Sequence, residues 1–492
     1  MPLDDIKQAR LDKLNHLRKA GVDPYPAKSW YTHNVAQVVE SFDTLVEEKR
    51  HAVLVGRVMA KREHGGSTFG DMYDGTGTIQ VFFKQDILGD KEYQLMSDTL
   101  DIGDFIEVSG KLFLTKRGEK TLEVEKYRML TKTLLPLPEK WHGLQDVEER
   151  LRKRYLDVLF NPKVKQAFET RAKITRALHD FMDRHGFLEV TTPTLQPLYG
   201  GASARPFKTH LNALDIDMFL RIAPELYLKR LLVGGFNAVY EFTTNFRNEG
   251  MDREHNPEFS AMEFYAAYKD LEWAMKFTEE MFQEVLQKAI GGTTVKYQDE
   301  TIQFSSPFIR STFNELLKSH AGVDYDYMEE DDMRVKAQAL GVVVDKVVSK
   351  ATLADEIFKK SIRHKLIQPT FVTDYPVDLL PLAKRIEGTD TVSAFQFYAG
   401  GFELIKAFTE LNDPVDQRQR FQAQESHRAK GDEEAQRMDE DYVEALEYGM
   451  PPAAGWGLGI DRFVALVTDS HSLRDVILFP TMKPRAEGAS EK

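Results

Sequence analysis

The segment Phe246–Phe259, with the sequence FRNEGMDREHNPEF, is a charged loop between two stretches in which polar and apolar residues alternate. The stretch before it is Asn237–Phe246 (NAVYEFTTNF), and the stretch after it is Ser260–Tyr265. Alternation with a period of two is typical of β-strands. The sequence therefore predicts two antiparallel strands joined by a loop that begins with Arg247.

The two predicted strands would present a polar face bordered by aromatic rings. A guanidinium group on such a face suits the phosphates and the base of a nucleotide, because it can donate paired hydrogen bonds and stack on a flat ring. The strand period places on this candidate face, in chain order, Glu241, Asn245, Arg247, Phe259, Glu263 and Tyr265.

A second informative segment, Gly457–Arg462 (GLGIDR), leads into an apolar helical stretch, FVALV. It supplies a second arginine, Arg462, at the start of that helix. The sequence contains neither the P-loop pattern G-x-x-x-x-G-K-[ST] nor a strand-linked G-x-G-x-x-G. Any bound ATP would consequently be held by side chains on a sheet.

Taken in order, these two segments resemble motifs two and three of the class II aminoacyl-tRNA synthetases, and the chain resembles the lysyl-tRNA synthetase family from end to end. The resemblance implies an α+β fold, in which an N-terminal five-stranded OB-type barrel precedes an antiparallel-sheet class II catalytic domain with helices. It implies ATP-dependent activation of L-lysine to lysyl-adenylate, transfer to the 3′ end of tRNA(Lys), and Mg²⁺ as cofactor. The helix–strand–proline unit Pro162–Pro193 resembles motif one, which implies a homodimer.

Bulk composition agrees with an ordinary globular protein of more than one domain. The chain has 492 residues, of which 42% are hydrophobic and 29% charged. The absence of cysteine excludes a disulfide scaffold, a thiol nucleophile and a Cys-ligated metal. No apolar run has the length of a membrane span, and the start lacks the apolar core of a signal peptide, so we expect a cytoplasmic protein.

The formal net charge of −13 does not argue against tRNA binding, because affinity for phosphates depends on local basic surface. One candidate basic surface lies on the first predicted helix. The alternative is that these charges are merely solvated. The basic residues of this helix are Lys7, Arg10, Lys13, Arg18 and Lys19.

Turn signals divide the chain between His51 and about Leu135 into five short alternating stretches, which suit a small OB-type barrel. Its aromatic and basic residues favour single-stranded nucleic acid, and we predict anticodon contacts by Phe69, Gln80 and Glu119. The alternative is a structural barrel with Phe69 in its core. The predicted divisions are 1–50, a helical segment; 51–135, the anticodon-binding barrel; 136–155, a linker; and 156–492, the catalytic domain with a helical insertion at about 297–369.

The resemblance implies roles for the residues of the ATP site. Arg247 would contact the α-phosphate and the amino-acid carboxylate and so stabilise the charge of the transition state. The adenine ring would lie between Phe259 and Arg462. The alternative for Arg247 is a surface ion pair with Glu249. The remaining ATP-site residues that the resemblance implies are Glu249 at the adenine amino edge, His255 near the outer phosphates, Asn256 and Glu403.

Carboxylates indicate which amino acid is bound. A substrate with an ammonium group at each end needs acidic partners at both ends. By resemblance, Glu225, Tyr265 and Glu410 would hold the side-chain ammonium, and Glu263 and Gly201 would hold the α-ammonium. An aspartate pocket would instead need a cation where these carboxylates stand. Other residues placed at the lysine by resemblance are Arg247, Lys406 and Phe408.

The chain departs from the family where a pair of metal-binding glutamates is usual. It has Gln396 at the first position, which makes that ligand doubtful, keeps Glu403 at the second, and has Lys406 where the family has an asparagine. Three hypotheses follow: Lys406 partly replaces a magnesium ion, it enters the amino-acid pocket, or it points elsewhere. Strand alternation puts Glu403 and Lys406 on opposite faces, so Glu403 needs a bulge to join the site.

Other functions remain as alternatives. A relative that lysylates proteins is disfavoured by the barrel, which such relatives lack. An aspartyl or asparaginyl enzyme is disfavoured by the pocket carboxylates. A non-catalytic RNA-binding paralogue has only Gln396 and Lys406 in its support, whereas Arg247 and Arg462 are both retained.

Overall fold

The computed structural model describes residues 2–138, 145–342, 349–429 and 437–485. The chain divides into two compact units, residues 1–143 and 144–492. Each has a hydrophobic core of its own. Within the described residues, no helix combines the length and apolar character that crossing a bilayer needs.

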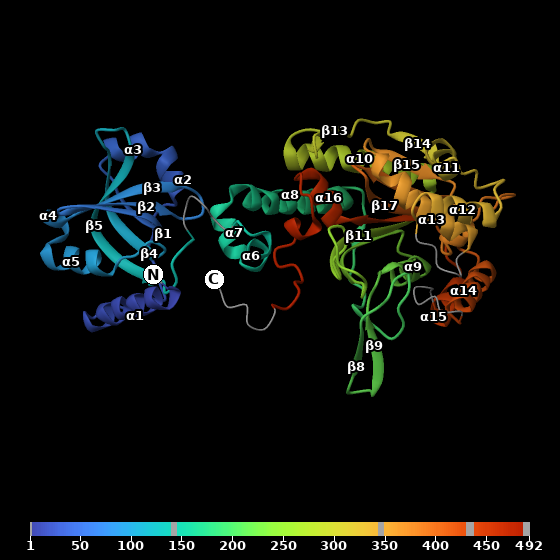
Figure 1. Ribbon diagram of the computed structural model, residues 1–492, viewed down its shortest axis with the longest axis horizontal. Coiled ribbons are helices and arrows are strands. Elements are labelled where there is room, and N and C mark those ends of the chain that lie inside the picture. The colour runs from blue at the N-terminus through green and yellow to red at the C-terminus, as the bar shows by residue number, and fades with distance from the viewer. Residues whose placement is uncertain (1, 139–144, 343–348, 430–436, 486–492) are drawn as a thin grey trace. The chain divides into compact units, whose positions relative to one another are not determined.

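The first unit contains the five-stranded barrel that the sequence predicted (Figure 1). The strands close in the order β1-β2-β3-β5-β4, and only the β3–β5 pair is parallel among these neighbours. Inward residues are buried at every second position of β2, which is why the sequence alternates. The elements are β1 His51–His64, β2 Ser67–Tyr73, β3 Thr78–Lys84, α4 Gln85–Leu88, α5 Asp90–Thr99, β4 Phe105–Leu114 and β5 Lys120–Thr131.

The predicted helical segment before the barrel holds three helices: α1 Leu3–Lys19, α2 Val35–Glu40 and α3 Phe42–Glu47. Helices α2 and α3 are separated only by Ser41, which caps neither with its side chain. Their hydrophobic residues pack on the barrel core, where Val35, Val38 and Phe42 are buried. A short helix pair is difficult to tell from one helix by periodicity alone.

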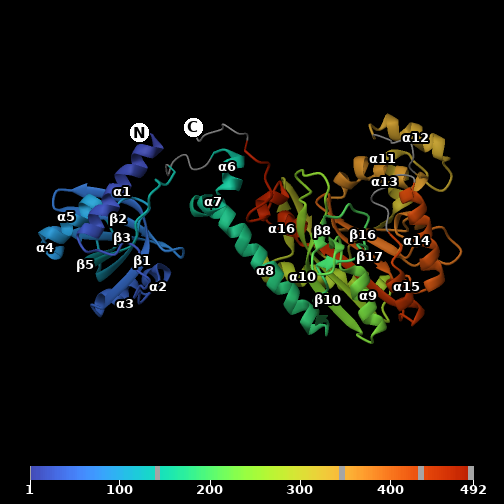
Figure 2. The same ribbon diagram turned by 90° about the horizontal axis from the view of Figure 1, so that it is seen from below.

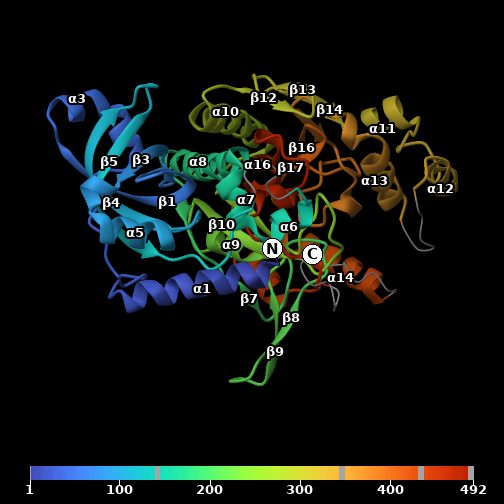
Figure 3. The same ribbon diagram turned by 60° about the vertical axis from the view of Figure 1, so that its left-hand side comes forward.

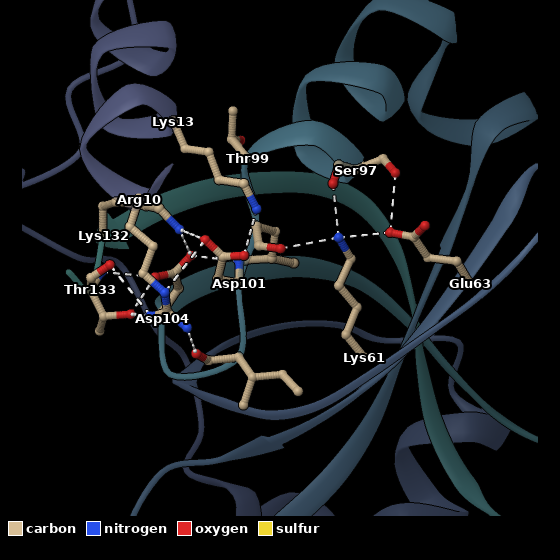
Figure 4. Close-up of polar contacts among 12 residues, drawn as sticks. Arg10, Lys13, Lys61, Glu63, Ser97, Thr99, Asp101, Asp104, Lys132 and Thr133 are labelled. Atoms are coloured by element: carbon tan, nitrogen blue, oxygen red, sulfur yellow. Dashed lines mark hydrogen bonds and ion pairs between the residues drawn. The ribbon is translucent and has the colours of Figure 1, made fainter. Parts of the chain in front are cut away.

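Helix α1 is fixed to the barrel by a buried polar network (Figure 4). Lys132 pairs with Asp101 at 2.6 Å and with Asp104 at 2.7 Å, and Lys13 pairs with Asp101 at 2.6 Å. Arg10 donates to backbone carbonyl groups of the barrel unit. The sequence had suggested that Arg10 and Lys13 belong to a basic surface. In the structure they are instead engaged in this network, Arg10 with backbone carbonyl groups and Lys13 with Asp101.

The second unit is built on an eight-stranded sheet with the order β14-β15-β16-β17-β18-β11-β10-β6. The strands from β15 to β10 are antiparallel to one another, whereas the edge strands β14 and β6 pair in parallel with β15 and β10. The strands are β6 Leu188–Glu189, β10 Ala238–Phe246, β11 Glu258–Ala267, β14 Ile309–Thr312, β15 Thr370–Thr373, β16 Ala394–Ala399, β17 Phe402–Thr409 and β18 Ala453–Gly459.

Helices cover both faces of this sheet (Figure 2). One core contains residues of α8 Pro162–Arg184, α10 Leu271–Ile290 and α16 Ile460–Val467. The other contains residues of the remaining catalytic-unit helices that pack on the sheet. These are α9 Glu225–Val233, α11 Phe313–Ala321, α12 Glu330–Ala339, α13 Lys350–Ser361, α14 Pro414–Ala429 and α15 Glu440–Glu447.

The expected helical insertion at about 297–369 is not purely helical. The β-hairpin β12 Thr294–Tyr297 and β13 Glu300–Gln303 and the edge strand β14 precede helices α11 to α13 (Figure 3). These strands have four residues each, which is too short for alternation to be recognised. Residues 343–348 of this prediction lie outside the described residues.

The smaller elements follow the sequence more closely. The predicted linker is described except for 139–144 and contains α6 Val147–Arg152 and the start of α7 Arg154–Phe160. The helix of the motif-one unit, α8, ends before Gly186, whose φ is 76°. The remaining elements are β7 Leu195–Gln196, β8 Lys208–Leu211 and β9 Ile216–Leu220, which form a three-stranded sheet, and the 3₁₀ helices Arg363–Lys365, Val377–Leu379 and Leu473–Val476.

Candidate active site

A cavity of about 300 Å³ opens over strands β10, β11, β17 and β18 of the catalytic unit. It brings together predicted residues from segments far apart in the sequence. Arg247 and Arg462 line the same cavity as Glu225, so the nucleotide and amino-acid ends of the predicted site meet. The other predicted residues that line it are Gly201, Glu249, His255, Asn256, Phe259, Glu263, Tyr265, Glu403, Lys406 and Phe408.

Arg247 lies at the end of β10 with its guanidinium 4.9 Å from the centre of the Phe259 ring. It is not in a surface ion pair with Glu249, whose carboxylate instead accepts from the backbone N–H of Arg205 at 3.2 Å. Burial lowers the pKa of Arg247. Its Nε is buried and has no hydrogen-bond partner within the described residues. A buried guanidinium with a free donor is suited to an anion.

The other residues of the predicted ATP end are held by local contacts. Arg462 donates to the backbone carbonyl of Glu403 at 3.0 Å. His255 is within 2.9 Å of the Asp252 carboxylate. Asn256 donates to the carbonyl of Glu258 at 2.6 Å, and its own Oδ1 is buried without a partner in the described chain.

Asp461, next to Arg462, was not singled out from the sequence but fixes the start of α16. Its carboxylate accepts from the backbone N–H of Ser260 at 2.9 Å and from Arg171 at 2.5 Å. These bonds tie α16 to β11 and α8. Its position beside Arg462 was visible in GLGIDR, but its partners could not be seen in the sequence.

At three glycines that border the pocket, a side chain would come too close to the pocket residues. A Cβ on Gly455 would lie 2.4 Å from the Tyr265 ring, and one on Gly457 would lie 3.2 Å from Cγ of Glu263. Gly201 has φ 84°, and its Cβ would lie 2.9 Å from that of Glu225. Glycine is therefore required where strand β18 and the Gly201 loop approach the carboxylates.

The amino-acid end of the cavity is acidic and buried. Glu225 is 5% exposed and Glu263 is 8% exposed, and Tyr265 donates to Glu263 at 3.3 Å. Burial, together with the nearby Glu225, raises the pKa of Glu263 to about 8. Burial likewise raises the pKa of Glu410 to about 8. A cationic ligand would offset this unfavourable clustering of carboxylates.

Glu410 does not line the cavity but lies behind its wall, with no exposed surface. Its partner is Lys229, which sequence reasoning missed. Lys229 is also fully buried, is 2.6 Å from Oε1 of Glu225, and makes a second ion pair with Glu410. Glu225 and Lys229 are four residues apart on α9, a helical spacing that could have indicated this pair.

The predicted bulge is present in β17. Tyr398 pairs with Glu403 and Phe397 pairs with Ile405, so Leu404 is the extra residue. As a result Glu403 and Lys406 both line the cavity. Burial alone would raise the pKa of Glu403, but the charges of Lys406 and Arg462 outweigh it and lower this pKa.

Gln396 does not line this cavity. Its Oε1 accepts hydrogen bonds from the hydroxyl groups of Tyr375, at 3.0 Å, and Tyr398. The described residues contain no group of three or more His, Cys, Asp or Glu side chains that could hold a metal. The residues present therefore do not fit a metal held by two glutamates, although Glu403 together with ATP phosphates could hold one magnesium ion.

The predicted anticodon residues lie in the barrel unit. Phe69 is half-buried on the outer face of β2 and stacks on Phe82 at 4.4 Å, so it is not a core residue. Gln80 lies on the same face of the β2–β3 pair and accepts from the Thr121 hydroxyl at 2.9 Å. Glu119 is exposed in the turn before β5.

Comparison with known proteins agrees with this fold and site. A family model described as tRNA synthetases class II (D, K and N) matches residues 146–483, and one described as an OB-fold nucleic acid binding domain matches residues 52–130. The fold is thus that of a class II tRNA synthetase with an OB-fold domain.

Curated relatives define the family more closely. A lysine–tRNA ligase of Moorella thermoacetica is 50% identical over 98% of this chain and 99% of its own length. Lysine–tRNA ligases of Pelotomaculum thermopropionicum and of a Roseiflexus species are 49% and 47% identical over 98% and 99% of this chain, and over 96% and 100% of their own lengths. The chain belongs to the lysine–tRNA ligase family.

Proposed function

We propose that this protein activates L-lysine with ATP, forming lysyl-adenylate and pyrophosphate, and then transfers the lysyl group to the 3′ end of tRNA(Lys). The observation that carries the proposal is the shared cavity of Arg247, Arg462 and the buried carboxylates Glu225 and Glu263. Guanidinium groups suit the nucleotide, and carboxylates suit a diamine.

In the first step the carboxylate oxygen of lysine attacks the α-phosphorus of ATP in line, and pyrophosphate leaves. Arg247 would hold the lysine carboxylate and an α-phosphate oxygen together, because its Nε has no partner of its own in the described structure. Phe259 and Arg462 would hold the adenine, Glu249 would accept from its amino group, and His255 and Asn256 would lie near the phosphates. No protein nucleophile is needed.

In the second step a terminal hydroxyl of the tRNA attacks the lysyl carbonyl of the adenylate, and AMP leaves with the electron pair of the broken C–O bond. We propose that the barrel binds the anticodon, with Phe69 stacking on a base and Gln80 and Glu119 making polar contacts. The half-buried Phe69 ring on the outer face of β2 supports this.

Lysine would bind at the acidic end of the cavity. Glu263 and Gly201 would receive the α-ammonium, and Glu225 and Tyr265 would receive the side-chain ammonium along the Phe408 ring. Glu410 would contribute its charge from behind the wall. The acidic lining disfavours aspartate and asparagine as substrates, because their side chains offer no cation to these carboxylates.

We propose that Glu403 and the ATP phosphates hold Mg²⁺, which when bound offsets phosphate charge. Gln396 would not be a ligand. Lys406, on the same cavity face as Glu403, would supply part of the positive charge that a second ion could otherwise provide. This hypothesis is supported by the lowered pKa of Glu403, which the charge of Lys406 favours after burial is overcome.

We further propose that the protein acts as a homodimer in the cytoplasm, as its resemblance to the family implies. The experiment that tests the main proposal is ATP–pyrophosphate exchange with purified protein, supplying each amino acid in turn. Exchange that depends on lysine, followed by charging of tRNA(Lys), supports it. Exchange that depends on aspartate or asparagine, or no exchange with any amino acid, refutes it.

A further inference from the structure

Lys229 is a cation that lies between Glu225 and Glu410 at the lysine end of the cavity, although its own side chain does not line the cavity. It lies on α9 and has no exposed surface, so it cannot exchange its partners for water. Burial would lower its pKa, but the charges of Glu225 and Glu410 outweigh this and raise it. Lys229 is therefore a permanent ammonium in this pocket.

Its surroundings resemble a binding site for an ammonium group. Besides the two carboxylates, the Lys229 nitrogen lies 5.2 Å from the centre of the Phe408 ring and 5.6 Å from that of Tyr265. Both rings also line the cavity. The titratable groups around it, from every element that packs there, are Glu225 of α9, Glu263 and Tyr265 of β11, Glu410 after β17 and Tyr442 of α15.

The charges of this pocket can be counted. Glu225, Glu263 and Glu410 bring three carboxylates, and Lys229 brings one ammonium. A bound lysine would bring two more ammonium groups, and its own carboxylate would face Arg247. The count of cations then equals that of carboxylates, which is the condition under which buried charges are tolerated.

We propose that Lys229 is a positioning and specificity residue, which holds Glu225 and Glu410 together so that all three carboxylates of the pocket can be ionised and balanced only when it contains an amino acid with two ammonium groups. The inference rests on the proposed function, because it deepens the account of lysine binding. Oε1 of Glu410 is buried and has no hydrogen-bond partner in the described structure. The ion pair with Lys229 therefore leaves hydrogen-bond acceptor capacity on this carboxylate.

The test is a cycle of three variants of the full-length protein: Lys229→Met, Glu410→Gln, and the two combined. Lysine-dependent ATP–pyrophosphate exchange gives kcat and the separate KM values for lysine and ATP. Each single change unbalances the count, so each should raise KM for lysine, on the order of 10–100-fold, while KM for ATP changes little. The combined change removes one charge of each sign and restores the balance.

The decisive comparison is between Glu410→Gln and the combined variant. Adding Lys229→Met to Glu410→Gln should lower KM for lysine again by about tenfold, a gain that loss of a purely structural contact cannot produce. This comparison holds even where Lys229→Met alone does not fold, because the combined variant has the same net charge in the empty pocket as the unaltered protein. An equal or higher KM for lysine in the combined variant, or its failure to fold, overturns the proposal.

The test of the role of Lys229 can fail independently of the test of the proposed function. If the unaltered protein shows no lysine-dependent exchange, the proposed function fails. If it is active but the combined variant shows no recovery, only the role of Lys229 fails.

Discussion

Replacing Glu263 by glutamine is expected to stabilise the ligand-free protein while removing lysine binding. The carboxylate is 8% exposed, and burial and the neighbouring Glu225 raise its pKa from 4.5 to about 8. The folded state therefore keeps a proton that the unfolded chain has already lost at neutral pH. Because the folded pKa lies above the unfolded one, stability falls as the pH rises between these two values.

The size of the effect follows from the two pKa values. At 1.36 kcal/mol per pKa unit, ionisation of the Glu263 side chain in the unfolded state destabilises the fold by about 3 kcal/mol at pH 7. Between pH 6 and pH 8 the loss amounts to about 2 kcal/mol. For a unit of about 350 residues, roughly 1–2 °C of midpoint shift corresponds to each kcal/mol, so this loss is roughly 3 °C. Glutamine has the same shape and does not ionise.

The assay is the thermal midpoint of the catalytic unit, measured by calorimetry on the full-length protein in the absence of lysine at pH 6, 7 and 8. The midpoint of Glu263→Gln minus that of the unaltered protein should increase across this range. The matched control is Glu300→Gln, because Glu300 is exposed in β13 and its replacement should leave the difference constant. Lysine-dependent exchange should fall by on the order of 100-fold or more in Glu263→Gln, since the α-ammonium loses its charged partner.

A difference that stays constant from pH 6 to pH 8 would show that the Glu263 carboxylate is already ionised in the empty pocket. The reasoning from burial would then be wrong, even if lysine binding were lost.

Three further predictions concern other parts of the site. Arg462→Lys keeps the charge but loses the flat guanidinium, so KM for ATP in the exchange assay should rise about tenfold with KM for lysine nearly unchanged; an equal rise in both would contradict the stacking role. The double variant Gln396→Glu, Lys406→Asn should bind ATP with a stronger dependence on magnesium, measured by calorimetric titration and by exchange; an identical dependence counts against Lys406 as a substitute for an ion. Phe69→Ala should raise KM for tRNA(Lys) in charging by about tenfold but leave exchange unaffected, and a loss of exchange would disprove a role confined to tRNA.

Much of the fold could be predicted from local patterns. Strands β2 and β3 of the barrel alternate strictly because one face of each is buried, whereas β11 of the β10–β11 hairpin is buried on both faces over most of its length. The bulge in β17 could be inferred because alternation and the expected role of Glu403 disagreed. The four-residue strands β13 and β14 could not be recognised, because their place in a sheet depends on partners elsewhere in the chain.

The candidate site was less fully predictable, because its charges depend on distant partners. Arg10 and Lys13 seemed available to nucleic acid, but Arg10 donates to barrel carbonyl groups and Lys13 pairs with Asp101. In the same way, Glu225 and Glu410 were predicted from the sequence, but Lys229, which pairs with both, was not. The sequence identifies the charged residues, but the fold determines which of them form ion pairs.

The extra residue in β17 makes the spacing of this strand as important as its composition. Leu404 has no partner in β16. This unpaired position determines which face of the sheet each later side chain of β17 occupies. Exchanging Glu403 or Lys406 would alter the chemistry of the cleft and leave its frame intact. Regular pairing of Leu404 with Tyr398 would instead turn the carboxylate of Glu403 toward the apolar layer that holds Phe397 and Ile405. In this part of the protein, the register between β16 and β17 places the Glu403 carboxylate as much as the identity of the residue does.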